Sequence, residues 1–177
     1  MSEPSTGVDA AATALLAVYD EALPAVYGYL LARCDGVPVA EDLTAETFFA
    51  AVDAARRPDP PAISVAWLIG VARHKLVDHW RRQSREQRGL HAVADAEPSA
   101  PDDPWDLHVD RLRTRATLAS LGPHHRAALT LRYVDGLPVA EVAHHLDRSV
   151  DATEALLVRA RNAFRAEYAE GGCDDDV

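Results

Sequence analysis

LGPHHRAALTLRYVDGLPVAEVAHHLDRSVDATEALLVRARNAFR, residues 121–165, is the stretch that decides the fold of this chain. Its apolar residues recur every three or four positions in three runs, which predicts three helices. Asp135-Gly136 separates the first two runs, and Asp147-Arg148-Ser149 separates the last two. Short helices joined by tight turns and followed by a longer helix are typical of a helix-turn-helix, whose last helix can enter the major groove of DNA.

These helices are expected over His124–Val134, over Pro138–Leu146 and from Val150 to about Glu167. Ser149 can cap the last helix, and its inward face is predicted to carry Thr153, Leu157, Ala160 and Phe164. An ordinary three-helix bundle without a DNA partner is the alternative. The residues expected to face the DNA are Ser149, Asp151, Ala152, Glu154, Ala155, Arg159 and Arg161.

Helical periodicity also dominates upstream, and no alternating strand pattern is evident. Helices are predicted over residues 10–33, with a kink or a new start at Pro24, over residues 39–56, from residue 65 to about 85 after a cap at Ser64, and from about 105 to 120. The fold class is therefore all-α, with two small helical domains over residues 10–88 and 111–168. A flexible acidic linker, residues 89–110, joins them, and the tail 169–177 is expected to be disordered.

Charge is distributed unevenly along the chain, whose formal net charge is −10. Residues 64–88 carry a net +4 and residues 111–170 a net +2, whereas residues 1–63 carry −7 and the linker −6. Phosphate contacts need local positive charge rather than a positive total. The two locally basic segments can therefore bind a polyanion despite the acidic whole.

Several classes of protein are disfavoured. The sequence has no run of about 18 apolar residues, so no membrane span is predicted. Its first residues lack a basic region ahead of an apolar stretch, so no secretory signal is predicted either, and we expect a cytoplasmic protein. Cys34 and Cys173 fit no disulfide or zinc pattern, and adjacent histidines such as His124 and His125 point about 100° apart on a helix. No phosphate loop or catalytic triad is evident, so neither an enzyme nor a cofactor is predicted.

Two upstream segments extend the argument beyond DNA binding. AEDLTAETFFAAV (residues 40–52) and AWLIGVARHKLVDHWRRQ (residues 66–83), followed by LRYVDGLPVAEVAHHL (residues 131–146), resemble RNA polymerase sigma factors of the two-domain, extracytoplasmic-function class. The resemblance covers residues 15–165. It implies a transcription initiation factor that binds core RNA polymerase, reads and melts the minus-ten promoter element, and contacts the minus-thirty-five element. It also implies an anti-sigma factor as a further partner.

The resemblance assigns roles to particular residues. Asp42, Glu46 and Phe49 correspond to the helix that grips the largest polymerase subunit. The loop from Pro58 to Val65 corresponds to one that captures a flipped base. The residues matched to minus-ten recognition are Arg73, His74, Lys75, Asp78, His79, Arg81 and Arg82.

The two tryptophans of the basic segment leave base stacking open to different degrees. Trp67 is expected in the core, whereas for Trp80 burial and stacking on an unpaired base remain equal alternatives.

One departure from the family concerns the last helix. Many relatives carry Thr-Val-Lys-Ser-Arg where this chain has Ala152-Thr153-Glu154-Ala155-Leu156. Two cations are thus replaced by Glu154 and Leu156, which predicts fewer phosphate contacts. We hypothesise a distinct minus-thirty-five preference with weak affinity of the isolated unit, in which Glu154 accepts from a cytosine amino group.

Two other functions stay open at this point. A sigma-like mimic would sequester an anti-sigma factor without touching DNA, and the acidic total favours it. A stand-alone helix-turn-helix regulator would leave the basic, tryptophan-bearing segment 66–83 without a purpose. For the initiation factor, the sign of the acidic linker suits a basic channel of the polymerase.

Overall fold

The structure is a computed structural model that describes residues 6–90 and 111–170 of the 177-residue chain. Within these ranges every regular element is helical, which confirms the all-α prediction. The main part of the predicted linker, residues 91–110, and residues 171–177 of the predicted tail lie outside the described residues. The chain divides into two compact units, Met1–Leu76 and Val77–Val177, so the boundary falls inside one helix.

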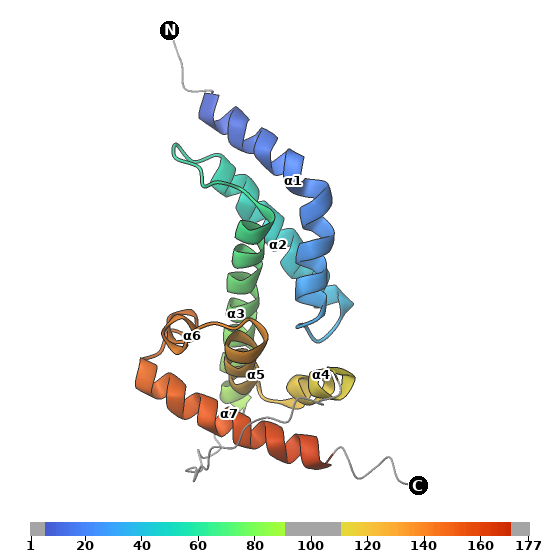
Figure 1. The fold of residues 1–177 in the computed structure, drawn as a ribbon, viewed down its shortest axis with the longest axis vertical. Helices are drawn as coiled ribbons and strands as arrows, with labels where there is room; N and C mark the ends of the chain where they lie inside the picture. The colour runs from blue at the N-terminus through green and yellow to red at the C-terminus, as the bar shows by residue number, and fades with distance from the viewer. Residues whose placement is uncertain (1–5, 91–110, 171–177) are drawn as a thin grey trace. The chain divides into compact units, whose positions relative to one another are not determined.

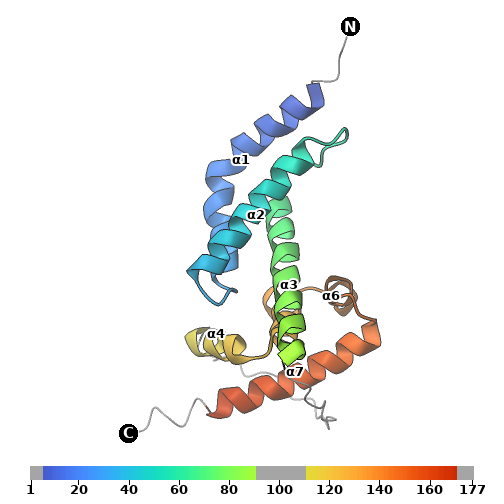
Figure 2. The same cartoon turned by 180° about the vertical axis from the view of Figure 1, so that it is seen from behind.

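The first unit is built from α1 (Thr6–Leu31), α2 (Val37–Ala55) and the first part of α3 (Val65–Leu90). Helices α1 and α2 pack along each other, as both ribbon views show (Figures 1 and 2). Their contact buries Val26, Leu30 and Leu43 completely or almost so. The exposed side of α2 is thereby left for other partners.

Pro24 lies inside a single helix rather than at the start of a new one. Proline lacks the N–H that would bond the preceding turn, so it bends a helix that continues through it. The ribbon of α1 accordingly changes direction within the helix (Figure 1). Of the two sequence-based alternatives, the kink is confirmed.

One part of α1 meets a membrane-span criterion that, on the sequence-based prediction, no segment would meet. Residues Ala12–Leu31 are long and apolar enough to cross a membrane by length and composition alone. The same segment carries Asp20, Glu21 and Pro24, and packs one side on α2. Burial against α2 accounts for the apolar character of that side.

The start of α3 is set by the predicted cap. The backbone N–H of Trp67 donates to Ser64 Oγ at 3.2 Å, and the helix begins at Val65. It runs to Leu90, five residues beyond the predicted end. Trp80 is 1% exposed, which decides its open assignment in favour of burial. The prediction that Trp67 lies in the core is wrong: it is only half-buried, near the start of α3.

The second unit adds α4 (Arg111–Ser120), α5 (Pro123–Leu129), η1 (Thr130–Val134), α6 (Val139–Leu146) and α7 (Val150–Glu170) to the end of α3. Helices α4, α5 and α6 each contact α7. The succession of α6, a tight turn and α7 is the predicted helix-turn-helix (Figure 1). Because α7 extends to Glu170, residues 169 and 170 belong to a helix rather than to the expected tail.

The segment predicted as one α-helix over His124–Val134 changes type in its second half. Residues Thr130–Val134 form a π-helix, in which the N–H of Asp135 donates to the carbonyl of Thr130 at 2.9 Å. The N–H of Leu137 also reaches back, to the carbonyl of Leu131 at 3.0 Å. The wider turn satisfies carbonyls that the Asp135-Gly136 turn would otherwise leave open at the end of an α-helix.

The turn between α6 and α7 follows the sequence closely. Asp147 adopts the left-handed conformation (φ 55°), and the N–H of Arg148 donates to the carbonyl of Ala143 at 3.0 Å, which closes α6. Ser149 Oγ accepts the N–H of Ala152 at 3.2 Å, so the predicted cap of α7 is confirmed. The four predicted inward residues of α7 are all buried: Thr153, Leu157, Ala160 and Phe164.

Arg126 fixes the joint between α4 and α5. Its side chain is buried, and its guanidinium donates to the carbonyls of Leu118, at 3.0 Å, of Ala119, and of Leu121, at 3.4 Å. These carbonyls belong to the end of α4 and to the residue after it, where helix geometry supplies no N–H partner. The arginine therefore takes the place of a C-terminal cap.

Replacing Gly136 with alanine should lower the free energy of unfolding more than the same replacement at Gly122. The Gly136 φ of +71° lies in the left-handed region, and no atom approaches the position of a Cβ. We expect Gly136→Ala to cost about 1 kcal/mol of the free energy of unfolding, through the backbone alone. Gly122→Ala is the matched control, because Gly122 is also uncrowded but has φ −56°. Thermal unfolding of both variants checks this, and equal losses would contradict the backbone explanation.

Candidate protein-binding and nucleic-acid-binding surfaces

The predicted polymerase-binding residues share one side of α2. Asp42 and Phe49 are exposed and Glu46 is half-exposed, at positions i, i+7 and i+4. The opposite side of the helix is anchored by buried residues, including Leu43 and Thr47. Phe49 is 71% exposed, which is unusual for a phenylalanine, so the sequence-predicted face combines two carboxylates with an unburied aromatic ring.

The first half of α3 carries the first three residues matched to minus-ten recognition. His74 is exposed, and Arg73 and Lys75 are half-buried. Lys75 Nζ lies 3.4 Å from Glu46 Oε2, so this lysine is paired with a residue of the α2 face. The sequence assigned these two side chains to different partners and gave no sign that they would meet.

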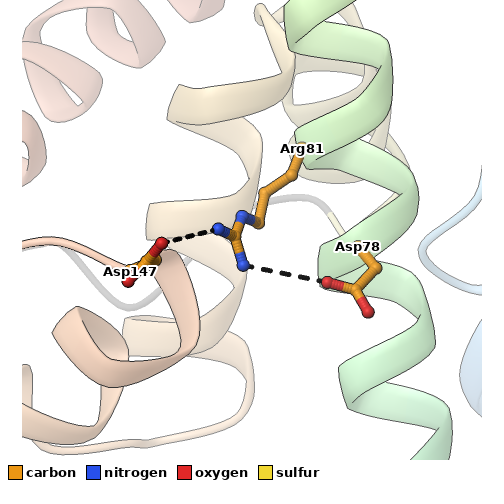
Figure 3. Close-up of polar contacts among 3 residues, drawn as sticks. All are labelled: Asp78, Arg81 and Asp147. Carbon is orange, nitrogen blue, oxygen red and sulfur yellow. Dashed lines mark hydrogen bonds and ion pairs between the residues drawn. The ribbon is translucent and has the colours of Figure 1, made fainter.

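The remaining minus-ten candidates lie beyond Leu76 on the same helix. Asp78 and Arg82 are exposed, and His79 and Arg81 are half-buried. Arg81 Nη2 donates to Asp147 Oδ2 at 3.0 Å, and Arg81 Nη1 lies 3.8 Å from Asp78 Oδ1 (Figure 3). Both carboxylates are largely exposed, so a phosphate can compete with them for this arginine at little cost.

The predicted recognition helix, α7, exposes carboxylates at its start. Asp151, Glu154 and Ala155 are exposed, as is Ser149 ahead of them, while Ala152, Arg159 and Arg161 are half-buried. Leu156, which stands where many relatives carry a cation, is buried in the core. The change from a cation at Leu156 therefore adds a core contact as well as removing a charge.

A shallow groove of about 360 Å³ lies beside α7. It brings Glu154 and Arg161 together with Arg132 and Tyr133 of η1, two residues that the sequence analysis had not assigned to any site. Tyr133 is exposed, and the Arg132 guanidinium donates to the carbonyl of Leu137 at 2.9 Å. The one feature of the sequence that could have indicated this groove is Tyr133, an aromatic residue shortly before the Asp135-Gly136 turn.

A second groove, of about 550 Å³, runs between α1 and α2 and was also missed. One wall is the edge-to-face pair of Tyr19 and Phe48, whose ring centroids are 5.2 Å apart. Glu41 lies at its edge on α2, one residue before Asp42 of the polymerase-binding face. The sequence analysis assigned neither aromatic residue to a site, because apolar spacing on a helix does not distinguish a filled interface from an open one.

Metal binding finds no support in the part of the chain that the structure describes. There, no three side chains of the His, Cys, Asp and Glu types come together in a way that could hold a metal ion.

Comparison with known proteins gives matches to both units. Residues 18–86 match the family model of sigma-70 region 2, and residues 111–164 match that of sigma-70 region 4. The chain is 34% identical to the ECF RNA polymerase sigma factor SigF of Caulobacter vibrioides, over 81% of this chain and 80% of the relative. It is 30% identical to SigL of Mycobacterium tuberculosis, over 94% of this chain and 96% of the relative.

Two further relatives set limits on the comparison. The chain is 32% identical to the ECF sigma factor BldN of Streptomyces coelicolor, but it spans only 56% of the length of that protein. The solved structure of the sigma factor RpoE from Bartonella quintana, in complex with the anti-sigma factor NepR, aligns with a TM-score of 0.50. It covers 86% of this chain and 92% of the other at 21% identity, so this likeness concerns the fold.

Proposed function

Because this chain belongs to the RNA polymerase sigma factors of the extracytoplasmic-function class, which direct the polymerase to promoters, we propose a division of labour among its helices. Helix α2 binds core RNA polymerase, α3 reads and melts the minus-ten element, and the start of α7 contacts the minus-thirty-five element. The protein acts without enzymatic chemistry of its own, in the cytoplasm, where polymerase and promoter meet.

The observation that carries the polymerase contact is the composition of the exposed α2 face. Phe49 is 71% exposed on α2, and Asp42 and Glu46 precede it on the same side of the helix, by about two turns and one turn. An aromatic residue beside carboxylates is suited to a partner that offers an apolar pocket and cations. Because burying Phe49 requires a partner, this face supports binding to another protein rather than a purely structural helix.

The basic positions of α3 support a role in promoter opening. His74 and Arg82 are exposed, and Arg73, Lys75 and Arg81 are half-buried, so cations line much of the helix. Separated strands expose phosphates that need cations and bases that need surfaces on which to stack. Trp67, which is half-buried, is the tryptophan of this helix available for such stacking, since Trp80 is in the core.

The contact with the minus-thirty-five element is supported by the helix-turn-helix geometry, and its strength is limited by charge. Ser149, Ala152 and Ala155 are small residues at the start of α7, which lets the helix approach base edges closely. Asp151 and Glu154, in contrast, face phosphates with the wrong sign. We therefore propose that this unit selects promoters only when α2 and α3 are also engaged.

Run-off transcription with core RNA polymerase on a library of promoters tests the proposal. We expect transcripts from a defined subset of promoters, present with the full chain and absent with core polymerase alone. Stable binding to core without any promoter-specific transcript would contradict it. That outcome would instead favour a sigma-like mimic that occupies an anti-sigma factor, the alternative that the acidic start of α7 supports.

An anti-sigma factor is the further partner that we propose. The Bartonella quintana sigma factor with a similar fold was solved with the anti-sigma factor NepR bound to it. A chain whose polymerase-binding face carries an exposed phenylalanine benefits from a protein that covers this face when it is idle. Competition between core polymerase and the inhibitor for α2 is the expected form of regulation.

Glu154 should decide part of the minus-thirty-five preference. A carboxylate in the major groove accepts from the amino group of cytosine, and a lysine donates to guanine instead. We expect Glu154→Lys to change the preferred sequence and to strengthen binding overall, by about tenfold for one good base contact. Selection of bound promoter fragments from a random pool measures both.

Glu141→Lys is the matched control for this variant, because Glu141 is exposed on α6 and gives the same change of charge away from the recognition positions. It should raise affinity weakly and leave the preferred sequence unchanged. An identical sequence preference in wild type and Glu154→Lys would rule out base reading by Glu154.

A further inference from the structure

One ion pair connects two surfaces that the proposed function uses separately. Glu46 belongs to the polymerase-binding face of α2, and Lys75 belongs to the DNA-binding positions of α3. Glu46 Oε2 and Lys75 Nζ are 3.4 Å apart, and both groups lie in the same compact unit. In the absence of core polymerase and DNA, the Glu46 carboxylate and the Lys75 ammonium group therefore neutralise each other.

Both members of the pair remain accessible. The Glu46 side chain is 42% exposed and the Lys75 side chain 33%, so a cation or a phosphate from outside reaches them without unfolding of the unit. Exchange of one partner for another at such a site costs little, because an exposed ion pair is worth at most about 1 kcal/mol. The pair is therefore suited to break when a stronger partner arrives.

The neighbouring charges favour the exchange of this ion pair for contacts with a basic protein surface on one side and a phosphate backbone on the other. On α2, Asp42 lies one turn before Glu46 on the same face, so a basic surface that binds Asp42 also meets Glu46. On α3, Lys75 lies in the locally basic segment 64–88, whose net charge is +4, so a phosphate backbone drawn to this helix also meets its ammonium group. Lys75 is the only lysine of the chain.

We infer that Glu46 is a positioning residue that couples polymerase binding to promoter binding through Lys75, an inference that rests on the proposed function. In the free chain Glu46 holds the Lys75 ammonium on α2. When cations of core polymerase take the Glu46 carboxylate, Lys75 is released and binds promoter phosphate. The coupling is reciprocal, so DNA that takes Lys75 leaves Glu46 more available to the polymerase.

The size of the coupling follows from the strength of the pair. An exposed ion pair of this kind changes an affinity by about two- to fivefold. Such a change shifts the balance between free and promoter-bound protein without acting as an all-or-none switch. It therefore disfavours unproductive DNA binding by the free chain.

A double-mutant cycle on the full chain tests the inference. Binding of a fluorescein-labelled oligothymidine is measured over a range of salt concentrations for wild type, Glu46→Gln, Lys75→Gln and the double variant. We expect Glu46→Gln to tighten binding about two- to fivefold. The plot of log affinity against log salt should steepen by about 0.7, the value of one additional phosphate contact to a single strand. With Lys75→Gln already present, Glu46→Gln should add no such gain.

Asp42→Asn is the matched control, because it removes the same charge from the same face of α2 and frees no lysine. Reciprocity gives a second readout, since Lys75→Gln should strengthen binding to core polymerase about two- to fivefold while Glu46→Gln weakens it. Circular dichroism verifies that the variants fold.

The outcomes separate the inference from the proposed function. A gain from Glu46→Gln that persists without Lys75, or that Asp42→Asn reproduces, overturns the coupling and leaves the sigma-factor role intact. A free chain that binds the oligothymidine in no variant at any salt concentration also overturns it. If wild type fails to bind core polymerase at all, the proposed function fails, whatever the oligonucleotide data show.

Discussion

Phe49→Ala is expected to weaken binding of the chain to core RNA polymerase by about 30-fold, and promoter-directed transcription should fall with it. Truncation of a central aromatic anchor at a protein interface costs about 2 kcal/mol, which corresponds to that factor. Phe49 is 71% exposed and lies beside two carboxylates on α2, so it is the anchor that the proposed polymerase contact requires. Titration of labelled chain with core polymerase measures the affinity directly.

The stability of the free chain provides an internal check on this variant. Removal of an exposed side chain changes the free energy of unfolding by no more than about 0.5 kcal/mol, so the variant remains folded. Leu16→Ala is the matched control, since Leu16 on α1 is 75% exposed and lies outside the proposed contact. Equal loss of affinity in both variants, or none in Phe49→Ala, would show that polymerase binds elsewhere.

Arg126→Met should lower the free energy of unfolding by about 3 kcal/mol, because it removes several hydrogen bonds from one helix end. The variant removes the donors for three carbonyls at the end of α4, of which that of Leu121 is in a buried hydrogen bond and the other two are in part-buried ones. A buried polar group left without a partner costs about 1–3 kcal/mol. Arg126 is 6% exposed, so water does not replace the lost donors fully. For a domain of this size, a loss of about 3 kcal/mol lowers the unfolding midpoint by more than about 10 °C.

Calorimetry of the full chain distinguishes this effect from a general loss of charge. Arg165→Met removes an exposed arginine from α7 and should leave the midpoint nearly unchanged. Arg126→Lys retains the charge but lacks the planar group that reaches several carbonyls, so an intermediate loss is expected. A midpoint for Arg126→Met within a degree or two of wild type would mean that the carbonyls find other partners.

The ends of the helices were largely predictable because they depend on local chemistry. Ser64 and Ser149 each cap the helix that follows, and Pro24 bends α1 without ending it. These effects involve only neighbours within about one turn, so the sequence around each position contains the whole cause. Helix α3 continues five residues beyond its predicted end, and α7 continues to Glu170. The exact last residue of a helix is the part of it that local sequence determines least.

The state of individual side chains was less predictable, because it depends on residues far along the chain. Trp80 and Leu156 proved to be buried, although each stands next to charged or small residues that gave no such indication. Lys75 meets Glu46, which lies 29 positions earlier, and no periodic pattern encodes that contact. Family resemblance named both of these residues as functional, but only the fold brings them together.

The π-helical turn at Thr130–Val134 has a consequence for comparing this chain with others. A π-helical turn accommodates one residue more than an α-helical turn, as though a residue had been inserted into a regular helix. Deletion of one residue here would let the segment become regular, and the direction of each side chain on one side of the turn would rotate by about 100°. Tyr133 would then leave the groove beside α7. The length of this short segment, rather than its composition, therefore sets which residue stands next to Glu154 and Arg161.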